Sequence, residues 1–399
     1  MLSGEPHRLM FCCGALQSVA AVAWWTLDVT GRHLRWHEPI AWTLPPSWAH
    51  AWLLLYGLFP FFIFGFLMTA GPNWLGAPKT PRAAFVPAAG LMAAGIVAVY
   101  VGLATHRALV TVGTLVHLAG WIWGVQALVV MAARHWNRNA RYAIVIFTFL
   151  GIGILGAATF SAAIASGSFA HVHVALHGAV WFFLLPIFAG VSTRMVPFFS
   201  SRILGAEVDY RPGWARPALM GGVVAHGLIE LAGSQSFLWI VDLPLAALIA
   251  YLALRWGLGR HGSVRLLAML HIPLAVLACA FALYGVLSVI VASGAMAGIG
   301  LAPLHLLVIG YFASTVIGMV SRVSLGHSGR PLAADTLTWA CFIAMIVCAV
   351  VRAAAEFVPT AAAASALIVA AALIWLATFG AWSWRYVPMY LSPRVDAAR

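Results

Sequence analysis

Histidine is the residue type in this chain that points most directly to chemistry. More than half of the 15 histidines fall inside long apolar segments. An imidazole is costly in lipid unless it pairs with another group or binds a ligand. It is also the commonest protein ligand for haem iron and copper. The histidines therefore predict either a metal or haem site, or a set of hydrogen bonds between helices.

Two pairs of side chains have the i, i+4 spacing that places them on one helix face: His173 with His177, and His226 with Glu230. We predict a metal or haem-iron site made by His173 and His177 with His226 or Glu230. His171 lies about 200° around a helix from His173, so it joins this metal site only if the helix begins after it. Glu230 is the only carboxylate well inside an apolar segment, which makes it the candidate catalytic or proton-carrying group.

A second pair, His50 and His305, is predicted to ligate a b-type haem. Both lie near the start of apolar segments that are expected to cross the membrane in the same direction, so the two imidazoles should lie at a similar depth. His50 also stands between Trp48 and Trp52, so an interfacial aromatic belt is an alternative reading of its position.

Some polar side chains in apolar segments are expected to have no ligand role. His117 and His271 are isolated in their segments, and a hydrogen bond to a neighbouring helix explains each of them. Asp28 and Asp242 lie close to predicted outer helix ends and are expected to be hydrated. For Glu230, a neutral, hydrogen-bonded acid is the alternative to a functional role.

The composition requires that these residues be positioned by membrane helices. The chain has 399 residues, of which 63% are hydrophobic and 8% charged, with a mean hydropathy of +0.97. Such a chain predicts an all-α polytopic membrane protein with a single transmembrane domain over residues 1–399. We place twelve spans at 9–29, 48–70, 83–104, 108–133, 142–166, 171–194, 215–233, 237–255, 266–292, 299–320, 336–355 and 361–384.

The basic residues alternate strongly between the two sides of this topology. The termini and the even-numbered loops carry 18 of the 22 Lys and Arg residues, and the odd-numbered loops carry 4. The positive-inside rule therefore predicts that both termini are cytoplasmic. The net charge of +12 follows from this topology, so no nucleic-acid partner is expected. None of the five cysteines forms a CxxC pair, which argues against a thiolate metal site.

Three segments resemble signatures of the NnrS family. They are GFLMTAGPNWLG (residues 65–76), GVSTRMVPFF (190–199) and SRVSLGHSGRPL (321–332). The resemblance implies a twelve-helix bacterial inner-membrane protein that binds haem and copper and is linked to nitric oxide. One departure concerns the family's WHAHEM-like motif, which here reads WAHAWL (48–53), so that Trp52 replaces the second histidine and Leu53 the glutamate.

A looser resemblance, at the level of fold, is to the main subunit of haem–copper oxidases and nitric oxide reductases. Those proteins also have twelve helices, with histidines in the outer half of helices 2, 6, 7 and 10. The present chain carries histidines on the same four predicted spans, but it lacks the adjacent His-His pair and the His-x-His of that family. A complete two-haem and copper centre is therefore not implied.

The segment from Arg322 to Arg330 predicts a tight cytoplasmic turn, because Gly326 and Gly329 flank His327. We expect a structural or inner-gate role for it. A role in ligand binding or proton entry remains the alternative.

We predict that the chain binds haem, with copper as an open addition, and acts on or responds to nitric oxide or a related diatomic ligand. Electrons would come from a quinol or a redox protein. One alternative is a proton-coupled or metal-ion transporter that uses the intramembrane His and Glu side chains. A second alternative is a haem-binding sensor or assembly factor without turnover.

Overall fold

The computed structural model describes residues 1–137 and 140–395, and every regular element within these ranges is a helix. Ten continuous helical segments among the described residues are long and apolar enough to cross a membrane. Helices satisfy their backbone hydrogen bonds internally, which is why they suit a chain this apolar. The protein is an all-α, multi-pass membrane protein, as the composition predicted.

The predicted spans at 215–233 and 237–255 correspond to α9 (Ala215–Leu231) and α10 (Trp239–Arg255). Each has 17 residues. At a rise of about 1.5 Å per residue they reach roughly 26 Å, somewhat less than the hydrocarbon core of a typical bilayer. Twelve crossings therefore remain a prediction beside the ten longer segments.

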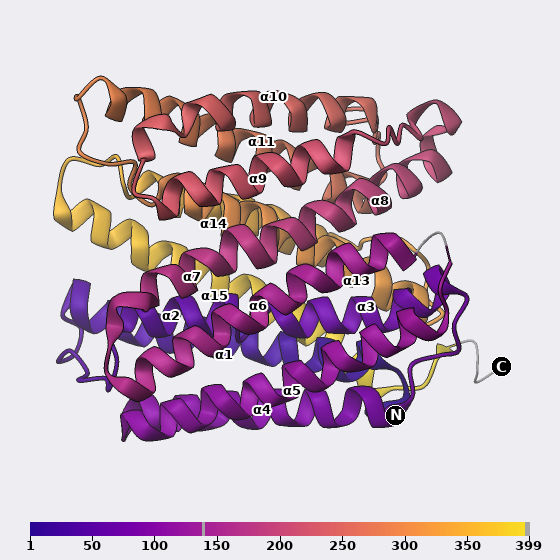
Figure 1. Ribbon diagram of the computed structural model, residues 1–399, viewed down its shortest axis with the longest axis horizontal. Coiled ribbons are helices and arrows are strands. Elements are labelled where there is room, and N and C mark those ends of the chain that lie inside the picture. Colours follow the sequence, from indigo (N-terminus) through magenta and orange to yellow (C-terminus); the bar gives the residue numbers. More distant parts are fainter. Residues whose placement is uncertain (138–139, 396–399) are drawn as a thin grey trace. The chain divides into compact units, whose positions relative to one another are not determined.

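The chain forms two compact units. The first unit consists of Met1–Gly31, His37–Ile187 and Ser383–Arg399. Its elements are η1 (Leu2–Gly4), most of α1 (Pro6–Leu34), α2 (Pro46–Leu55), α3 (Phe59–Leu75), α4 (Arg82–Ala104), α5 (Arg107–Arg134), α6 (Ala140–Ser166), η2 (Phe169–His171), α7 (Val172–Ala179) and η3 (Val180–Leu184) (Figure 1).

Helices α4 and α5 lie side by side in the first unit, joined by a short turn (Figure 1). Glycines allow this close approach. A Cβ atom on Gly95 of α4 would lie 2.4 Å from the backbone nitrogen of His117 on α5, and one on Gly120 would lie 2.7 Å from the carbonyl oxygen of Ala88. Small residues let membrane helices pack backbone against backbone.

The predicted span at 48–70 lies within the membrane-length segment Pro46–Leu75, in which a short turn separates α2 from α3. Pro60 has no N–H group, so the carbonyl oxygen of Tyr56 loses its usual helical donor. The side chain of His117 replaces it, with Nε2 lying 2.9 Å from the Tyr56 oxygen. The predicted span is therefore confirmed as part of the membrane-length segment Pro46–Leu75, with a local interruption at residues 56–58.

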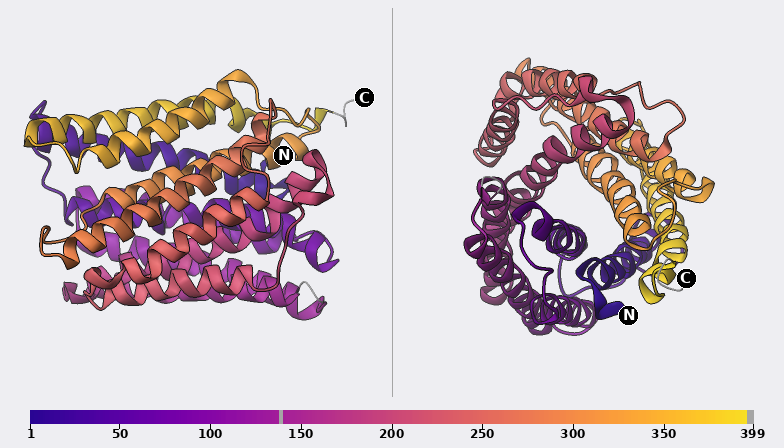
Figure 2. Two further views of the ribbon diagram at one scale, coloured as in Figure 1. Left: turned by 90° about the horizontal axis from the view of Figure 1, so that it is seen from above. Right: turned by 90° about the vertical axis from the view of Figure 1, so that its right-hand side faces the viewer.

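The second unit consists of Arg32–Trp36 and Phe188–Trp382. Its elements are most of α8 (Leu185–Leu204), η4 (Ala206–Val208), α9, η5 (Gln235–Phe237), α10, α11 (Arg265–Ala292), α12 (Ala302–His305), η6 (Leu306–Ala313), α13 (Ser314–His327), α14 (Thr336–Ala354) and most of α15 (Ala361–Leu391). Figure 2 shows α14 and α15 running side by side, where the Cys348 thiol donates to the Ala371 oxygen over 3.1 Å.

Candidate functional site

The predicted ligands divide between the two units. His50, His171, His173 and His177 belong to the first unit, whereas His226, Glu230 and His305 belong to the second. The predicted haem pair and the predicted metal site each combine residues of both units, so these combinations stay predictions.

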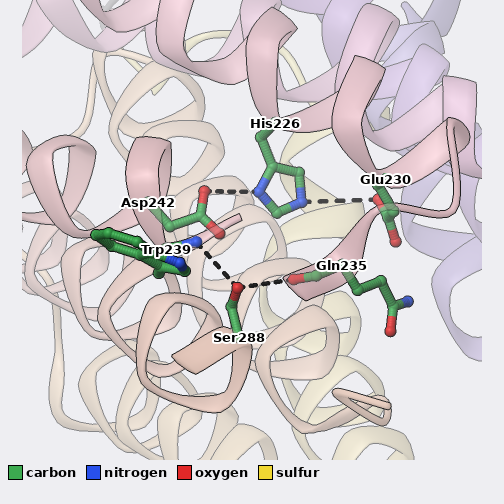
Figure 3. Close-up of polar contacts among 6 residues, drawn as sticks. All are labelled: His226, Glu230, Gln235, Trp239, Asp242 and Ser288. Carbon is green, nitrogen blue, oxygen red and sulfur yellow. Dashed lines mark hydrogen bonds and ion pairs between the residues drawn. The ribbon is translucent and has the colours of Figure 1, made fainter. Parts of the chain in front are cut away.

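His226 lies at the centre of a buried acidic cluster in the second unit (Figure 3). Its Nδ1–H donates to Oδ1 of Asp242 on α10 over 2.7 Å, and its Nε2 lies 3.6 Å from Oε2 of Glu230, one turn along α9. His226 and Asp242 are both 0% exposed, and Glu230 is 8% exposed. The i, i+4 spacing of His226 and Glu230 thus brings the two side chains together, as predicted.

Asp242 was expected to be hydrated, and that prediction was wrong. The carboxylate is buried because α9 and α10 form a hairpin that turns near Ser234, and His226 and Asp242 each lie eight residues from that point. Equal distances from a helical turn place two residues at the same height on facing helices. This symmetry was the signal in the sequence that could have identified the pair. Asp28 is also buried, 4% exposed, and accepts from the Trp42 indole over 3.1 Å.

Helix α11 closes the cluster on a further side. Hydrogen bonds from Ser288 fix the hairpin turn: its hydroxyl donates to the Gln235 oxygen over 2.7 Å and accepts from the Trp239 backbone N–H over 3.0 Å (Figure 3). The ring of Tyr284 lies edge-on to His226, with 4.7 Å between the ring centroids. The imidazole is therefore held between two acids and an aromatic wall.

Two carboxylates that share one imidazole in a dry site have more negative than positive charge when all three groups are ionised. Such a site retains a proton or attracts a cation to restore neutrality. Within residues 1–137 and 140–395, no three His, Cys, Asp or Glu side chains are arranged so that they could hold a metal ion. The cluster of His226, Glu230 and Asp242 is suited to holding a proton, and a metal role for His226 stays a prediction.

His173 and His177 form the second cluster of interest, in the first unit. Their rings stack along one face of α7, with 3.9 Å between the centroids. His171 belongs to the 3-10 turn η2, and α7 begins at the following residue. The helix has therefore not begun at His171, which is the condition under which that residue was expected to join its neighbours.

His305 has a fixed ring orientation. Its Nδ1–H donates to the Leu301 oxygen over 2.8 Å, which leaves Nε2 with a lone pair. A backbone bond at one nitrogen is the usual way in which a protein prepares the other nitrogen for a metal. The Leu301 backbone N–H lies 3.4 Å from Oε2 of Glu356, which is paired with Arg352 over 2.9 Å.

A π-helix lies just beyond each of these histidines along the chain. The five-residue η3 begins three residues after His177, and the eight-residue η6 begins directly after His305. π-Helical turns are rare and concentrate at functional sites, because the wider turn shifts side chains that an α-helix would stack. Neither segment was predicted from the apolar pattern, which is similar for α- and π-helices.

A small cavity lies beside η6 within the second unit. Its only polar lining atoms of note are hydroxyls, those of Ser192 and Tyr311, which are 3.1 Å apart. The remaining lining is apolar and comes from Ala189, Leu219, Ile249, Leu252, Trp256, Leu274 and Leu277. Such a lining suits a small molecule of low polarity.

His50 stacks on Trp25, with ring centroids 4.0 Å apart and an angle of 25° between the planes. Trp52, two residues further on, is 1% exposed and contacts His117 with 5.4 Å between ring centroids. The position that carries the second histidine in the WHAHEM-like motif is thus inside the core of the first unit.

The two histidines expected to have only structural roles are hydrogen-bonded within the protein. His117 lies between three helical segments, with Nδ1 3.0 Å from the Met92 oxygen and Nε2 2.9 Å from the Tyr56 oxygen. A neutral imidazole carries one N–H, so it donates to one of these two carbonyls at a time. Nε2 of His271 is hydrogen-bonded to the Ser200 hydroxyl over 2.8 Å. These bonds explain how both imidazoles are accommodated among apolar helices.

The Arg322–Arg330 segment differs from its prediction. Helix α13 continues to His327, so Arg322 is helical, and the turn is confined to Ser328 and Gly329, whose φ is +73°. Gly326 is helical rather than part of a tight turn.

The family of the chain is established over nearly its whole length. A comparison with curated proteins found no match. The model of the family described as NnrS protein matches residues 1–394 of the 399. Together with the multi-pass helical fold, this match shows that the chain belongs to the NnrS protein family.

Proposed function

We propose that this protein binds a b-type haem, together with copper, in the membrane and uses them to bind or turn over nitric oxide or a related diatomic molecule. Membership of the NnrS family gives the general support. The observation that carries the proposal is the His305 imidazole, whose Nδ1–H is committed to the Leu301 oxygen over 2.8 Å. Its Nε2 is thereby prepared for a metal at the start of a π-helix.

His305 fits haem ligation through its fixed tautomer, and His50 is proposed as the second haem ligand. The stacked ring of Trp25 restricts the orientation of His50. Bound haem would supply an iron centre that accepts diatomic ligands and changes redox state. The chain's own contribution is to hold the two imidazoles in defined orientations and to keep the site dry.

His173 and His177 fit a copper ion, because two imidazoles on one helix face can chelate a single metal. His171, just before the start of α7, is proposed as a further ligand that joins the pair when a metal binds, because in the structure the three imidazoles are not arranged around one ion. The apolar cavity near Ser192 and Tyr311 supports a small, weakly polar substrate. A neutral diatomic molecule reaches such a cavity through lipid without a polar channel.

A reduced-minus-oxidised visible spectrum of the purified protein, with metal analysis, tests the proposal. We expect haem b bands and copper in the wild type. His305→Ala should lose the haem bands, and His177→Ala should lose copper. His271→Ala is the matched control, because that buried histidine is bonded to Ser200, and it should keep both cofactors. Absence of haem and copper from the folded wild type would refute the proposal.

A second experiment separates turnover from sensing. Nitric oxide is added to the haem-loaded protein together with a reductant, which replaces the proposed quinol or redox-protein donor, and the loss of nitric oxide is followed. Consumption faster than in the His305→Ala variant indicates an enzyme. Binding without consumption indicates a sensor or assembly factor.

The cluster of His226, Glu230 and Asp242 favours a second candidate function, a proton-coupled transporter. Two buried acids and one imidazole at a helical hairpin can hold a transported proton. Proton uptake by vesicles that contain the protein, lost in Glu230→Gln, would support this function. Proton uptake unchanged by that variant would exclude the cluster as its carrier.

We propose a bacterial inner-membrane location with both termini cytoplasmic, on the basis of the 18-to-4 distribution of Lys and Arg. Reporter fusions at the two termini should both be active in the cytoplasm. Activity of either fusion only on the other side of the membrane would refute this orientation.

A further inference from the structure

Two arginines in the C-terminal halves of α8 and α13 lie over neighbouring phenylalanine rings of the second unit. The Arg322 guanidinium carbon is 3.9 Å from the centroid of Phe199, and that of Arg202 is 5.1 Å from the centroid of Phe198. The centroids of the two phenylalanine rings are 5.1 Å apart. The two cations therefore share one aromatic platform where two membrane-length segments end.

Neither guanidinium meets an acceptor in the part of the chain that the structure describes: the ring contacts are its only interactions there. Arg322 is half-buried, whereas Arg202 is exposed. Arg330, at the end of the Arg322–Arg330 segment, has a buried Nη1 that also lacks a partner among the described residues. A guanidinium has five N–H donors, and leaving them unsatisfied where water is scarce costs free energy.

The carboxylates of the second unit are already engaged elsewhere. Each has a partner or a capping role: Glu207 with Arg260, Asp209 with Arg211, Glu230 and Asp242 with His226, Asp335 with the backbone of Thr338, and Glu356 with Arg352. Neither Arg322 nor Arg202 therefore has an acceptor among the acidic side chains of this unit, which leaves both guanidinium groups available to an external anion. Helix C-termini attract cations, but this attraction does not supply the missing acceptors.

We propose that Arg322, Arg202 and the Phe198–Phe199 platform bind a phosphate group, that of an anionic phospholipid. The Arg322 guanidinium lies over the Phe199 ring, which leaves its N–H groups available to an acceptor, and a phosphate can offer two oxygens to a guanidinium. The position at the ends of two membrane-length segments matches the depth of a lipid headgroup. Free inorganic phosphate offers the same chemistry, and the experiment distinguishes the two sources.

The test uses the full-length protein, purified in a neutral detergent and stripped of lipid. Phosphatidylglycerol, phosphatidylcholine or inorganic phosphate is added, and thermal unfolding and bound lipid (by native mass spectrometry) are measured. We expect phosphatidylglycerol to bind and to raise the unfolding temperature more than phosphatidylcholine does. An equal rise with inorganic phosphate alone would keep the site but assign it to a free anion. No rise with any of the three would overturn the proposal.

The variants locate the effect at the platform. Arg322→Gln should weaken phosphatidylglycerol binding by about tenfold or more, which is the loss expected for a charge-assisted hydrogen-bonded contact. Arg260→Gln is the matched control, because Arg260 is already paired with Glu207 over 2.9 Å, and it should bind as the wild type does. Arg322→Lys keeps the charge and is used if Arg322→Gln does not fold; it should also bind more weakly, since it loses the stacked fork. Wild-type lipid affinity in a folded Arg322 variant would refute the assignment.

Discussion

Replacing Asp242 tests whether the buried cluster stabilises the α9–α10 hairpin. The carboxylate is 0% exposed and lies 2.7 Å from His226 Nδ1. Asp242→Ala leaves that N–H without an acceptor in a site that water does not reach, which costs about 1–3 kcal/mol. Asp242→Asn keeps an oxygen in place and loses only the charge, so we expect about half that cost.

The expected shift in unfolding temperature follows from the size of the second unit. For a unit of this size, 1 kcal/mol corresponds to about 2–4 °C. Asp242→Ala should therefore lower the unfolding temperature by roughly 2–12 °C, measured by tryptophan fluorescence in detergent. The matched control is Asp209→Asn, because that carboxylate is 40% exposed beside Arg211 and surface pairs contribute little.

A double-mutant cycle separates the pair from unrelated effects of the substitution. If His226 and Asp242 act together, the variant with both replaced should lose less stability than the sum of the two single losses. An unfolding temperature of Asp242→Ala equal to that of Asp209→Asn, or two single losses that simply add in the double variant, would refute a stabilising His226–Asp242 pair.

Two further predictions concern the first unit. His117→Ala should destabilise it by about 1–3 kcal/mol, because the Tyr56 oxygen loses the donor that compensates for Pro60. Thermal unfolding should show a smaller loss when the same substitution is made in a Pro60→Ala background. An equal loss in both backgrounds would contradict this role of His117. Gly95→Ala should destabilise by about 1–3 kcal/mol or more, because a Cβ there lies 2.4 Å from a backbone nitrogen of the facing helix. Gly90→Ala is the control, with nothing within 4 Å, and should be neutral or slightly stabilising; similar melting of the two variants would refute the close-packing argument.

The helices themselves could be predicted because apolar runs of membrane length leave few alternatives. The spacing of His226 and Glu230, and of His173 and His177, likewise fixed which side chains share a helix face. These features depend only on local sequence and on the helical repeat.

What the sequence did not reveal depends on contacts between segments. Asp242 was predicted to be hydrated at a helix end, but its surroundings are determined by the hairpin that α10 forms with α9. The break after α2 requires a donor from α5, far along the chain. The π-helices change the register of side chains without changing composition. None of these features has a signature within a single apolar segment.

The most direct test of the central proposal is chemical rescue at His305. The cavity left in His305→Gly should accept free imidazole, because the native ring is held by a backbone carbonyl that the substitution leaves in place. We predict that the variant, purified without imidazole, lacks the haem b spectrum of the wild type, and that millimolar imidazole restores it. A His305→Gly protein that shows the unaltered wild-type haem spectrum without imidazole would contradict the assignment of His305 as a haem ligand.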